Sequence, residues 1–215
     1  MTAEVTHKLR ADAQENRDRI LDAARALFSE RGLEASMREV AWYAEVGPAT
    51  LYRRFPTKQA LIDDVFEDEL RACRQIVVDG CADPDPWRGF SFVVERLSVL
   101  NVRNKGFVDA FMSADPQAPV FTHHRAAVLR QLRTLAARAK RAGRLRHDFV
   151  LDDLVLVLLA GRGLSATSPA NRTLAARRFA ALALDAFRED EGNGALPRKP
   201  ALVEEVVRIP FGTER

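Results

Sequence analysis

The 215-residue sequence contains no uninterrupted apolar run of about 18 residues, the length that a membrane-spanning helix needs. Its first residues carry the charges of Glu4, Lys8 and Arg10, where a secretory signal would need an apolar stretch. These two absences exclude the usual marks of a membrane or exported protein. We therefore expect a cytoplasmic protein with no membrane partner.

Cysteine and metal-binding patterns are also scarce. Cys73 and Cys81 are too few for a disulfide framework and lack CxxC spacing, which favours two reduced thiols and leaves a redox switch as the alternative. The four histidines form no HExxH or similar motif. We find no convergent set of nucleophile, base and metal ligand. The sequence therefore predicts no metal, no cofactor and no catalytic residues.

Strand patterns are missing as well, because no alternation of apolar and polar residues is long enough to indicate a sheet. Nearly every segment has helical periodicity, and a hydrophobic content of 47% suffices for a real core. Net charge is only +3, and the pI of about 9.1 is compatible with nucleic-acid binding without establishing it. We predict an all-α protein with about nine helices.

Two helices are predicted before residue 45. In residues 16–31 the apolar side chains recur at helical spacing, and Gly32 stands where a helix C-terminus favours a left-handed residue. Ser36 and Glu39 have the spacing of a capping box, in which each side chain binds the other's backbone N–H. A second, short helix should therefore begin at Met37.

Two further helices follow. After a break at residues 45–47, Pro48 suits the first position of a third helix, which should end near Phe55. Thr57 can then cap a fourth helix, and the apolar spacing predicts that this helix continues without interruption to about Gly80.

The rest of the chain is also helical in pattern, up to a tail rich in Gly, Pro and charge with a possible amphipathic piece at 201–207. The cationic run from Arg125 to Arg146 is expected to be a solvated helix face, with an accessory nucleic-acid or acyl-phosphate surface as the alternative. The predicted helices span 86–101, 104–113, 116–142, 151–166 and 169–190. The predicted domains are an arm at 1–15, a helix-turn-helix domain at 16–58, a ligand-binding and dimerisation domain at 59–190, and a tail at 191–215.

The two short helices after a longer one form a helix-turn-helix pattern, whose second helix can enter the major groove of DNA. Arg53, Arg54 and Lys58 stand beside Tyr52 with no acidic residue among them. Cations and a phenol hydroxyl suit the phosphate walls of that groove. The alternative is a solvated face of arginines with Tyr52 in the core.

The stretch from Ala-Ala-x-x-Leu-Phe through Val-Ala to Thr-Leu-Tyr-x-x-Phe-x-x-Lys, within residues 17–66, resembles the N-terminal signature of the TetR family of bacterial transcriptional regulators. The remaining residues match only in architecture. The resemblance implies phosphate contacts from Thr50, Tyr52 and Lys58. It implies a base or phosphate contact from Arg38 and sequence readout at Pro48, Ala49 and Arg53. The expected DNA-binding residues are Arg38, Gly47, Pro48, Ala49, Thr50, Tyr52, Arg53, Arg54 and Lys58.

Two positions depart from the family pattern. Glu45 stands where the family usually has Gly, so either the backbone avoids a left-handed conformation there or it carries a strain of about 1 kcal/mol. Gly47 stands where Ser usually caps the recognition helix, although Gly is a tolerated cap. Trp42 and Tyr43 are bulky for a short helix, and we expect them to pack on a neighbouring helix rather than to touch DNA.

The family resemblance and the palindromic logic of DNA recognition both predict a homodimer. The helices at 151–166 and 169–190 are too apolar to face water on all sides, and their alanines allow close helix approach. We expect them to form a four-helix seam between two copies. The alternative is that both helices fill the core of their own subunit.

The resemblance also implies a pocket for an unknown small-molecule effector, although apolar side chains of the middle helices can equally fill a solid core. Arg162 lies in the most apolar helix and needs an acidic partner, a carbonyl or an anionic ligand, and we favour an internal salt bridge. The candidate ligand-binding residues are Phe90, Val94, Leu97, Phe107, Phe111, Met112, Phe121, Leu158 and Arg162.

Together these patterns predict a ligand-responsive DNA-binding regulator. We expect a repressor that binds a palindromic double-stranded operator as a dimer and is released by a small, largely apolar effector. A dimeric helical adaptor and an all-α enzyme are the alternatives, but the first leaves the cations of residues 53–58 without a purpose and the second lacks a catalytic set.

Overall fold

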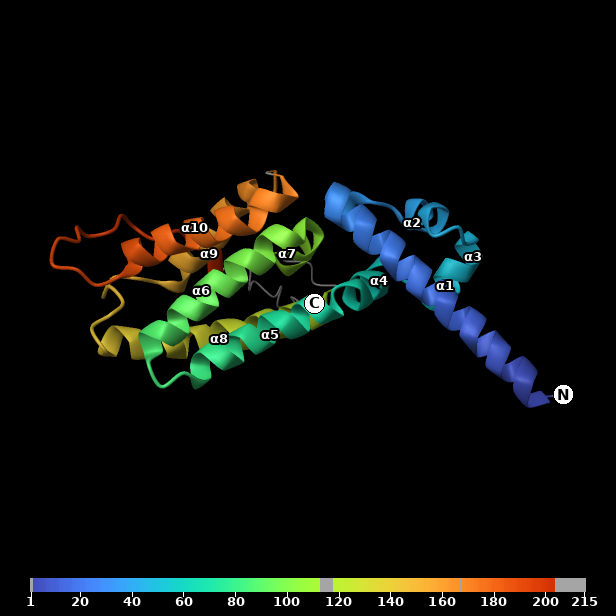
Figure 1. The fold of residues 1–215 in the computed structure, drawn as a ribbon, viewed down its shortest axis with the longest axis horizontal. Helices are drawn as coiled ribbons and strands as arrows, with labels where there is room; N and C mark the ends of the chain where they lie inside the picture. The colour runs from blue at the N-terminus through green and yellow to red at the C-terminus, as the bar shows by residue number, and fades with distance from the viewer. Residues whose placement is uncertain (1, 113–117, 167, 204–215) are drawn as a thin grey trace, which may run out of the picture. The chain divides into compact units, whose positions relative to one another are not determined.

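The computed structural model describes residues 2–112, 118–166 and 168–203 (Figure 1), which confirm the all-α prediction. These residues form ten α-helices and two 3-10 helices, and the only β pairing among them is an isolated bridge between Leu145 and Arg188. None of the described helices is long and apolar enough to cross a membrane. The chain divides into two compact units, Met1–Asp68 and Glu69–Arg215.

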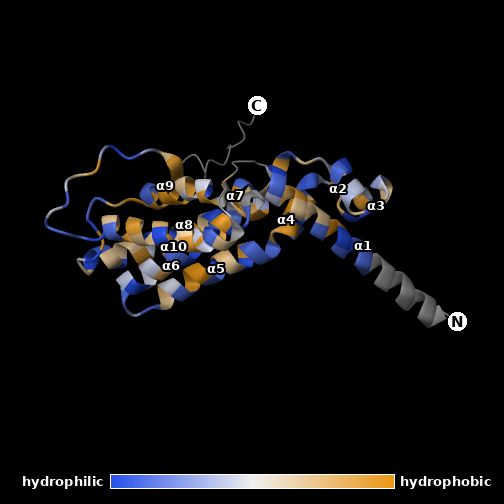
Figure 2. Cartoon of the chain, turned by 45° about the horizontal axis from the view of Figure 1, so that its top comes forward, coloured by the Kyte–Doolittle hydropathy of each residue, from blue (hydrophilic) through white to orange (hydrophobic). Residues whose placement is uncertain are grey.

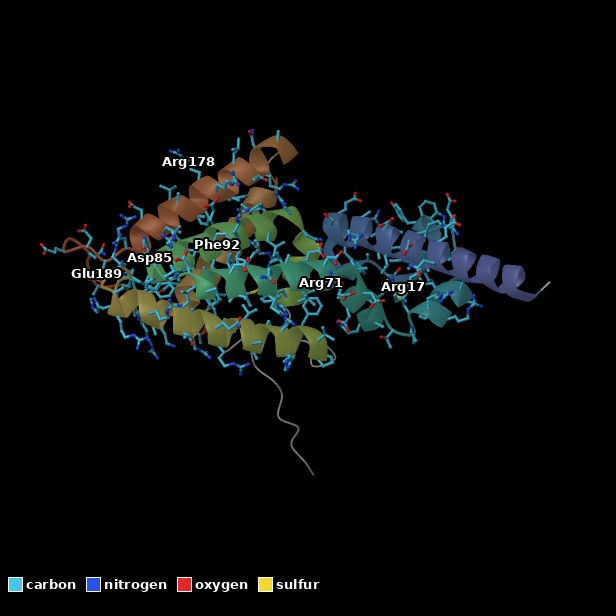
Figure 3. All side chains as sticks on the ribbon, turned by 60° about the horizontal axis from the view of Figure 1, so that its bottom comes forward. Arg17, Arg71, Asp85, Phe92, Arg178 and Glu189 are labelled. Atoms are coloured by element: carbon cyan, nitrogen blue, oxygen red, sulfur yellow. The ribbon has the colours of Figure 1, made fainter. Side chains whose placement is uncertain are left out.

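The N-terminal unit contains five helices. Its first helix begins at Thr2, whereas the apolar spacing predicted a start after residue 15; residues 2–15 contain no Pro or Gly that would stop a helix. A 2.8 Å salt bridge between Arg17 Nη2 on this helix and Asp64 Oδ2 joins it to the last helix of the unit, Lys58–Val65; Figure 3 labels Arg17. The helices are α1 Thr2–Arg31, the 3-10 helix η1 Gly32–Glu34, α2 Met37–Tyr43, α3 Pro48–Arg54 and α4 Lys58–Val65.

Local capping interactions fix the starts of these helices. The backbone N–H of Glu39 donates to Ser36 Oγ at 3.2 Å, and the N–H of Ser36 donates to Glu39 Oε2 at 2.7 Å, which completes the predicted capping box of α2. These bonds, with Arg31 as a further contribution, lower the pKa of the Glu39 carboxyl. Thr57 Oγ1 accepts from the N–H of Ala60 at 3.0 Å and caps α4.

The prediction of one uninterrupted helix from residue 57 to Gly80 is wrong. The helix breaks at Phe66, which separates α4 from α5 Glu67–Ala82. Phe66 is fully buried and its ring lies 6.1 Å from that of Phe28 in α1. We infer that tertiary packing of this ring takes precedence over the local helical pattern.

In the C-terminal unit, α6 is the central helix and packs against α8, α9 and α10. At its start it approaches α5 so closely that a Cβ on Gly89 would lie 2.1 Å from the carbonyl oxygen of Gly80. Only glycine fits at this crossing. The helices are α6 Pro86–Arg103, α7 Lys105–Met112, α8 Pro119–Arg141, α9 Leu151–Gly161, the 3-10 helix η2 Arg162–Ala166 and α10 Pro169–Phe187.

The expectation of a solvated face for the cationic run from Arg125 to Arg146 is wrong for three of its members. Arg125 is 2% exposed and donates to the carbonyl of Phe111 at 2.8 Å. Arg146 is also buried and pairs with Asp148 at 2.6 Å. Arg138 is half-buried and donates to two main-chain carbonyls, at 2.7 and 2.9 Å. These guanidinium groups satisfy carbonyls at chain turns, which helical periodicity does not reveal.

After α10 the chain forms a hydrophilic segment, drawn mainly blue in Figure 2, and then returns to the C-terminal unit at Val203. Most of the predicted amphipathic piece at 201–207 lies outside the described residues.

Candidate DNA-binding surface and ligand cavity

The helix-turn-helix consists of α2, the turn at residues 44–47, and α3. The turn is closed by a 3.0 Å hydrogen bond from the N–H of Val46 to the carbonyl of Ala41. On α3, Leu51 is fully buried and anchors the helix, while Ala49 and Arg53 lie on the opposite, exposed face. The helix therefore presents its short side chains and its arginines to solvent.

The exposed side of this motif is cationic. Arg38 on α2 and Arg53 and Arg54 on α3 are exposed, and none of the three forms a salt bridge with a described residue. The acidic side chain on α2, Glu39, pairs with Arg31 at 3.0 Å and is occupied by the capping box. Unpaired guanidinium groups at this spacing suit phosphate oxygens or the acceptor edges of bases.

The nine predicted DNA-binding residues differ in their environment. Seven are exposed, and Tyr52 belongs to them, so it is not a core ring. Thr50 and Lys58 are half-buried, and the ammonium group of Lys58 donates to the carbonyl of Leu33 in η1. The exposed residues are Arg38, Gly47, Pro48, Ala49, Tyr52, Arg53 and Arg54.

The two unusual turn residues have distinct geometries. Glu45 has a φ of 54°, so of the two conformations that the sequence left open the structure contains the strained, left-handed one. Gly47 caps α3 with an extended backbone and forms no side-chain cap hydrogen bond. A Cβ added to Gly47 would meet no atom within 4 Å. The turn therefore carries backbone strain at Glu45 and has no side-chain cap at Gly47.

The expectation that Trp42 and Tyr43 pack on a neighbouring helix is wrong. Trp42 is 75% exposed and Tyr43 is 45% exposed. Their rings contact each other edge to face, with centroids 5.0 Å apart and an interplanar angle of 80°. The buried side of α2 is made by smaller residues, Val40 and Ala41 among them, so the short helix has no room for either ring on its inner face.

The C-terminal unit contains an apolar cavity of about 80 Å³. Five of the nine predicted ligand-binding residues line it, namely Leu97, Phe107, Phe111, Met112 and Leu158. The other lining residues come from α5, α6, α7, α8, α9 and the tail, and Asn101 is the only one with a side-chain amide. A cavity with this lining suits an apolar ligand rather than an ion.

The remaining four predicted ligand residues do not line the cavity. Phe90 lies in an aromatic cluster, 5.4 Å from the ring of Phe149, and Phe121 packs 6.4 Å from Phe107. Val94 is fully buried on α6. Arg162 forms a salt bridge with Asp109, the internal partner that the sequence analysis favoured.

Twelve of the seventeen lining residues were not among the predicted ligand-binding residues, and three of these are Asn101, Cys73 and Val203. Asn101 donates from Nδ2 to the carbonyl of Leu158 at 2.7 Å, and its position on α6 one turn after Leu97 was the available signal. Burial raises the pKa of the Cys73 thiol to about 12, so this thiol is not a reactive thiolate. Val203 comes from the tail, and no local pattern indicated that a residue so distant in sequence would reach the cavity.

The tail is held to the C-terminal unit by two aspartates and an arginine. The N–H of Val203 donates to Asp152 Oδ1 at 3.0 Å, and the N–H of Leu196 donates to Asp148 Oδ2 at 3.0 Å. Arg146 donates to the carbonyl of Gly194 at 2.7 Å. The same Arg146 side chain is the main cause that holds the pKa of Asp148 well below its usual range.

Helices α9 and α10 expose large apolar side chains. Leu156 on α9 is 51% exposed, and Leu174 and Leu182 on α10 are 64% and 61% exposed. Leu174 and Leu182 are two turns apart, and Arg178 between them points outward (Figure 3). The buried residues of α10, Ala176 and Ala180 among them, lie on its other side.

Comparison with known proteins places this geometry in a family context. The model of the family described as bacterial regulatory proteins, tetR family, matches residues 20–65. The HTH-type transcriptional repressor KstR of Mycolicibacterium smegmatis is 34% identical over 148 residues, which cover 66% of this chain and 71% of KstR. The HTH-type transcriptional regulator UidR of Escherichia coli K12 is 33% identical over 102 residues, 46% of this chain and 48% of UidR. The chain thus spans about half the length of UidR.

Among solved structures, the TetR transcriptional regulator SCO0520 from Streptomyces coelicolor is 29% identical. Its TM-score is 0.50, and the match covers 80% of this chain and 98% of that chain. The likeness extends over both compact units.

Proposed function

This chain belongs to the TetR family of bacterial transcriptional regulators, and from that premise we propose that it is a cytoplasmic repressor that binds a palindromic DNA operator as a homodimer and is released by an apolar effector. The observation that carries the proposal is the exposed cationic face of α2 and α3. Arg38, Arg53 and Arg54 lie on it without a salt bridge to any described residue. Such a surface suits DNA, whose phosphates can pair with these guanidinium groups.

The residues of the motif divide into two kinds of DNA contact. The start of α3, with Pro48 and Ala49, enters the major groove, and Arg53 one turn later reads base edges. Tyr52, Thr50, Arg54 and Lys58 contact phosphates, which fixes the register of the helix but carries no sequence information.

Two half-sites require two copies, because one short recognition helix contacts only a few base pairs. The exposed leucines of α9 and α10 support a seam in which these helices pair with the same helices of a second copy. Burial of Leu156, Leu174 and Leu182 in that seam would remove from water the largest apolar side chains that the C-terminal unit exposes on these two helices.

The cavity of the C-terminal unit is the proposed effector site. Its lining supports a ligand that is apolar over most of its surface, with at most one polar group directed at Asn101. Binding to this site weakens operator binding when the ligand prefers the conformer that does not bind DNA. By linkage, operator DNA must then weaken effector binding by the same factor.

The deciding experiment is fluorescence anisotropy with labelled duplex DNA from upstream of the protein's own gene, titrated at several salt concentrations. The logarithm of the affinity should fall linearly with the logarithm of salt concentration, with a slope of about −0.9 for each phosphate contact. Arg53→Ala should weaken binding, whereas Arg130→Ala, which removes an exposed cation from α8, should not. Binding that is absent, or insensitive to salt and to Arg53, would overturn the proposal in favour of a dimeric adaptor.

A further inference from the structure

Trp42 is the most exposed large apolar residue among the described side chains, yet it lies in a helix of only seven residues that forms half of the DNA-binding motif. It stands four residues after Arg38, so the two side chains lie on the same face of α2. Tyr43 and Glu39 lie about 100° further around the helix, on the adjacent side, where Tyr43 is exposed and Glu39 is half-buried. A partner that contacts Arg38 would therefore also lie against Trp42, one helical turn further along α2.

The indole has no intramolecular use that explains its position. Its ring contacts the ring of Tyr43 edge to face, which restricts its orientation without burying it. Within the described residues its Nε1–H has no hydrogen-bond partner. An indole left in water loses the free energy that burial of its apolar surface supplies.

We propose that Trp42 contacts the DNA backbone, with its ring against a deoxyribose and its Nε1–H donated to a phosphate oxygen. This inference rests on the proposed function, since it assigns a further contact to the same surface. In a helix-turn-helix the first helix crosses the sugar-phosphate backbone while the second enters the groove. The exposed face of α2 that carries Arg38 and Trp42 is the face available for that crossing.

The chemistry of the surroundings favours DNA over a protein partner. An indole N–H only donates, and phosphate oxygens only accept. Arg38 on the same face of α2, and Arg53 and Arg54 on the exposed side of α3, are cations, which complement a polyanion. Glu39, the acidic side chain on α2, is held by the N–H of Ser36 and by Arg31, away from this face. The indole therefore adds an apolar ring and one hydrogen-bond donor to the cationic surface.

The test uses the fluorescence of the intact chain. The protein has two tryptophans, and the other one, Trp87, is buried against Phe90. Acrylamide, a neutral quencher, should therefore quench mainly Trp42, and the difference between the wild type and Trp42→Phe isolates its signal. Saturation with duplex DNA from upstream of the gene should lower the quenching constant of Trp42 by about twofold or more, because contact removes most of its surface from solvent.

Two matched variants separate the contact from a structural effect. Trp42→Phe removes the N–H donor and should weaken binding by about 10-fold or more on operator and random-sequence duplex alike, since one hydrogen bond to a charged acceptor is lost. Tyr43→Phe, on the adjacent side of α2, keeps the ring that contacts Trp42 and should change affinity by less than about twofold. Neither variant should lower the melting temperature, because both rings are exposed.

The outcomes are distinguishable from failure of the proposed function. Full DNA binding by anisotropy, with Trp42 as quenchable as before and Trp42→Phe as tight as the wild type, would overturn this inference alone. No DNA complex on either duplex would overturn the proposed function and this inference with it. An affinity loss confined to particular operator sequences would reassign Trp42 from the backbone to base readout.

Discussion

Lys58, the first residue of α4, donates a hydrogen bond from its ammonium group to the main-chain carbonyl of Leu33 in η1. The bond joins two segments 25 residues apart in sequence and fastens the start of α4 to the chain that follows α1. An ammonium group has three donors, so this bond leaves others for a phosphate. Lys58 thus stabilises the N-terminal unit besides its proposed contact with DNA.

Replacement of Lys58 by Met should therefore have two effects. The variant should lose about 1 kcal/mol of unfolding free energy, because the Leu33 carbonyl loses its partner, and it should bind all duplexes more weakly by a similar factor. Arg54→Met is the matched control, since Arg54 is exposed with no salt bridge to a described residue, and it should weaken DNA binding with no change in stability. Urea unfolding and anisotropy measure the two effects separately. A stable Lys58→Met variant with altered operator preference would contradict both assignments.

Glu45→Gly should stabilise the protein by about 1 kcal/mol. The φ of 54° at Glu45 costs a residue with a Cβ about 1–2 kcal/mol, and glycine adopts it freely, although its greater entropy in the unfolded chain offsets part of the gain. Glu15→Gly, in the interior of α1, should destabilise the protein by about 1 kcal/mol and serves as the control. A loss of stability in Glu45→Gly would mean that the carboxylate makes a compensating contact.

Features set by neighbouring residues were predictable, and features set by distant ones were not. The capping box of Ser36 and Glu39 and the start of α3 at Pro48 follow from short spacings in the chain. The break at Phe66 and the burial of Arg125 depend on partners that only the folded chain brings near. Arg38 was expected to contact DNA from the family resemblance, whereas the size of the Trp42 ring was mistaken for evidence of burial.

The same limit applied to the cavity. Helical periodicity identified which residues point inward, and five of the predicted set line the cavity. Periodicity does not distinguish a residue that fills the core, such as Phe90, from one that borders empty space, because both lie on the inner face. The tail residue Val203 lies within the predicted amphipathic piece at 201–207, but local periodicity does not show which part of the fold that piece contacts.

Leu182→Glu should dissociate the proposed dimer. A charge on the exposed face of α10 would be buried against its symmetry mate in the seam, at a cost of several kcal/mol per dimer. Val78→Glu, at an exposed apolar residue of α5, is the matched control and should leave the assembly intact. Sedimentation velocity measures the change in mass. A Leu182→Glu variant that sediments as the wild type does would place the seam elsewhere.

The buried imidazole of His124 predicts acid sensitivity. Burial, followed by the charges of Arg74 and His123, lowers its pKa from 6.5 to about 4. The unfolded chain therefore takes up a proton first as the pH falls, so stability present above pH 6.5 is lost progressively towards pH 4, by up to about 3 kcal/mol.

His124→Leu removes this titration and should flatten the dependence of the unfolding free energy on pH in that interval. His123→Leu, at the exposed neighbour, should keep most of the dependence. Urea unfolding between about pH 7 and pH 4.5 provides the curves. Equal slopes in the wild type and His124→Leu would show that other groups govern the acid response.

Asp152 holds the tail at Val203, a residue that lines the cavity. Its buried carboxylate accepts from the N–H of Val203 at 3.0 Å and lies 3.9 Å from the ammonium group of Lys199, and Val203 is part of the cavity wall. Loss of a hydrogen bond to a charged acceptor costs about 1.5–3 kcal/mol, which would raise the population of the released tail by about 10-fold or more.

Asp152→Ala should therefore accelerate association of an apolar neutral dye such as Nile red by about tenfold, measured by stopped-flow fluorescence. Asp79→Ala is the control, since Asp79 is exposed on α5 and bonds only to Gln75 among the described residues. Val203→Trp, with Asp152 intact, should instead reduce dye binding, because the larger ring occupies the space that the dye needs. Equal association rates in the wild type and Asp152→Ala would mean that a ligand reaches the cavity by another route, without displacement of the tail.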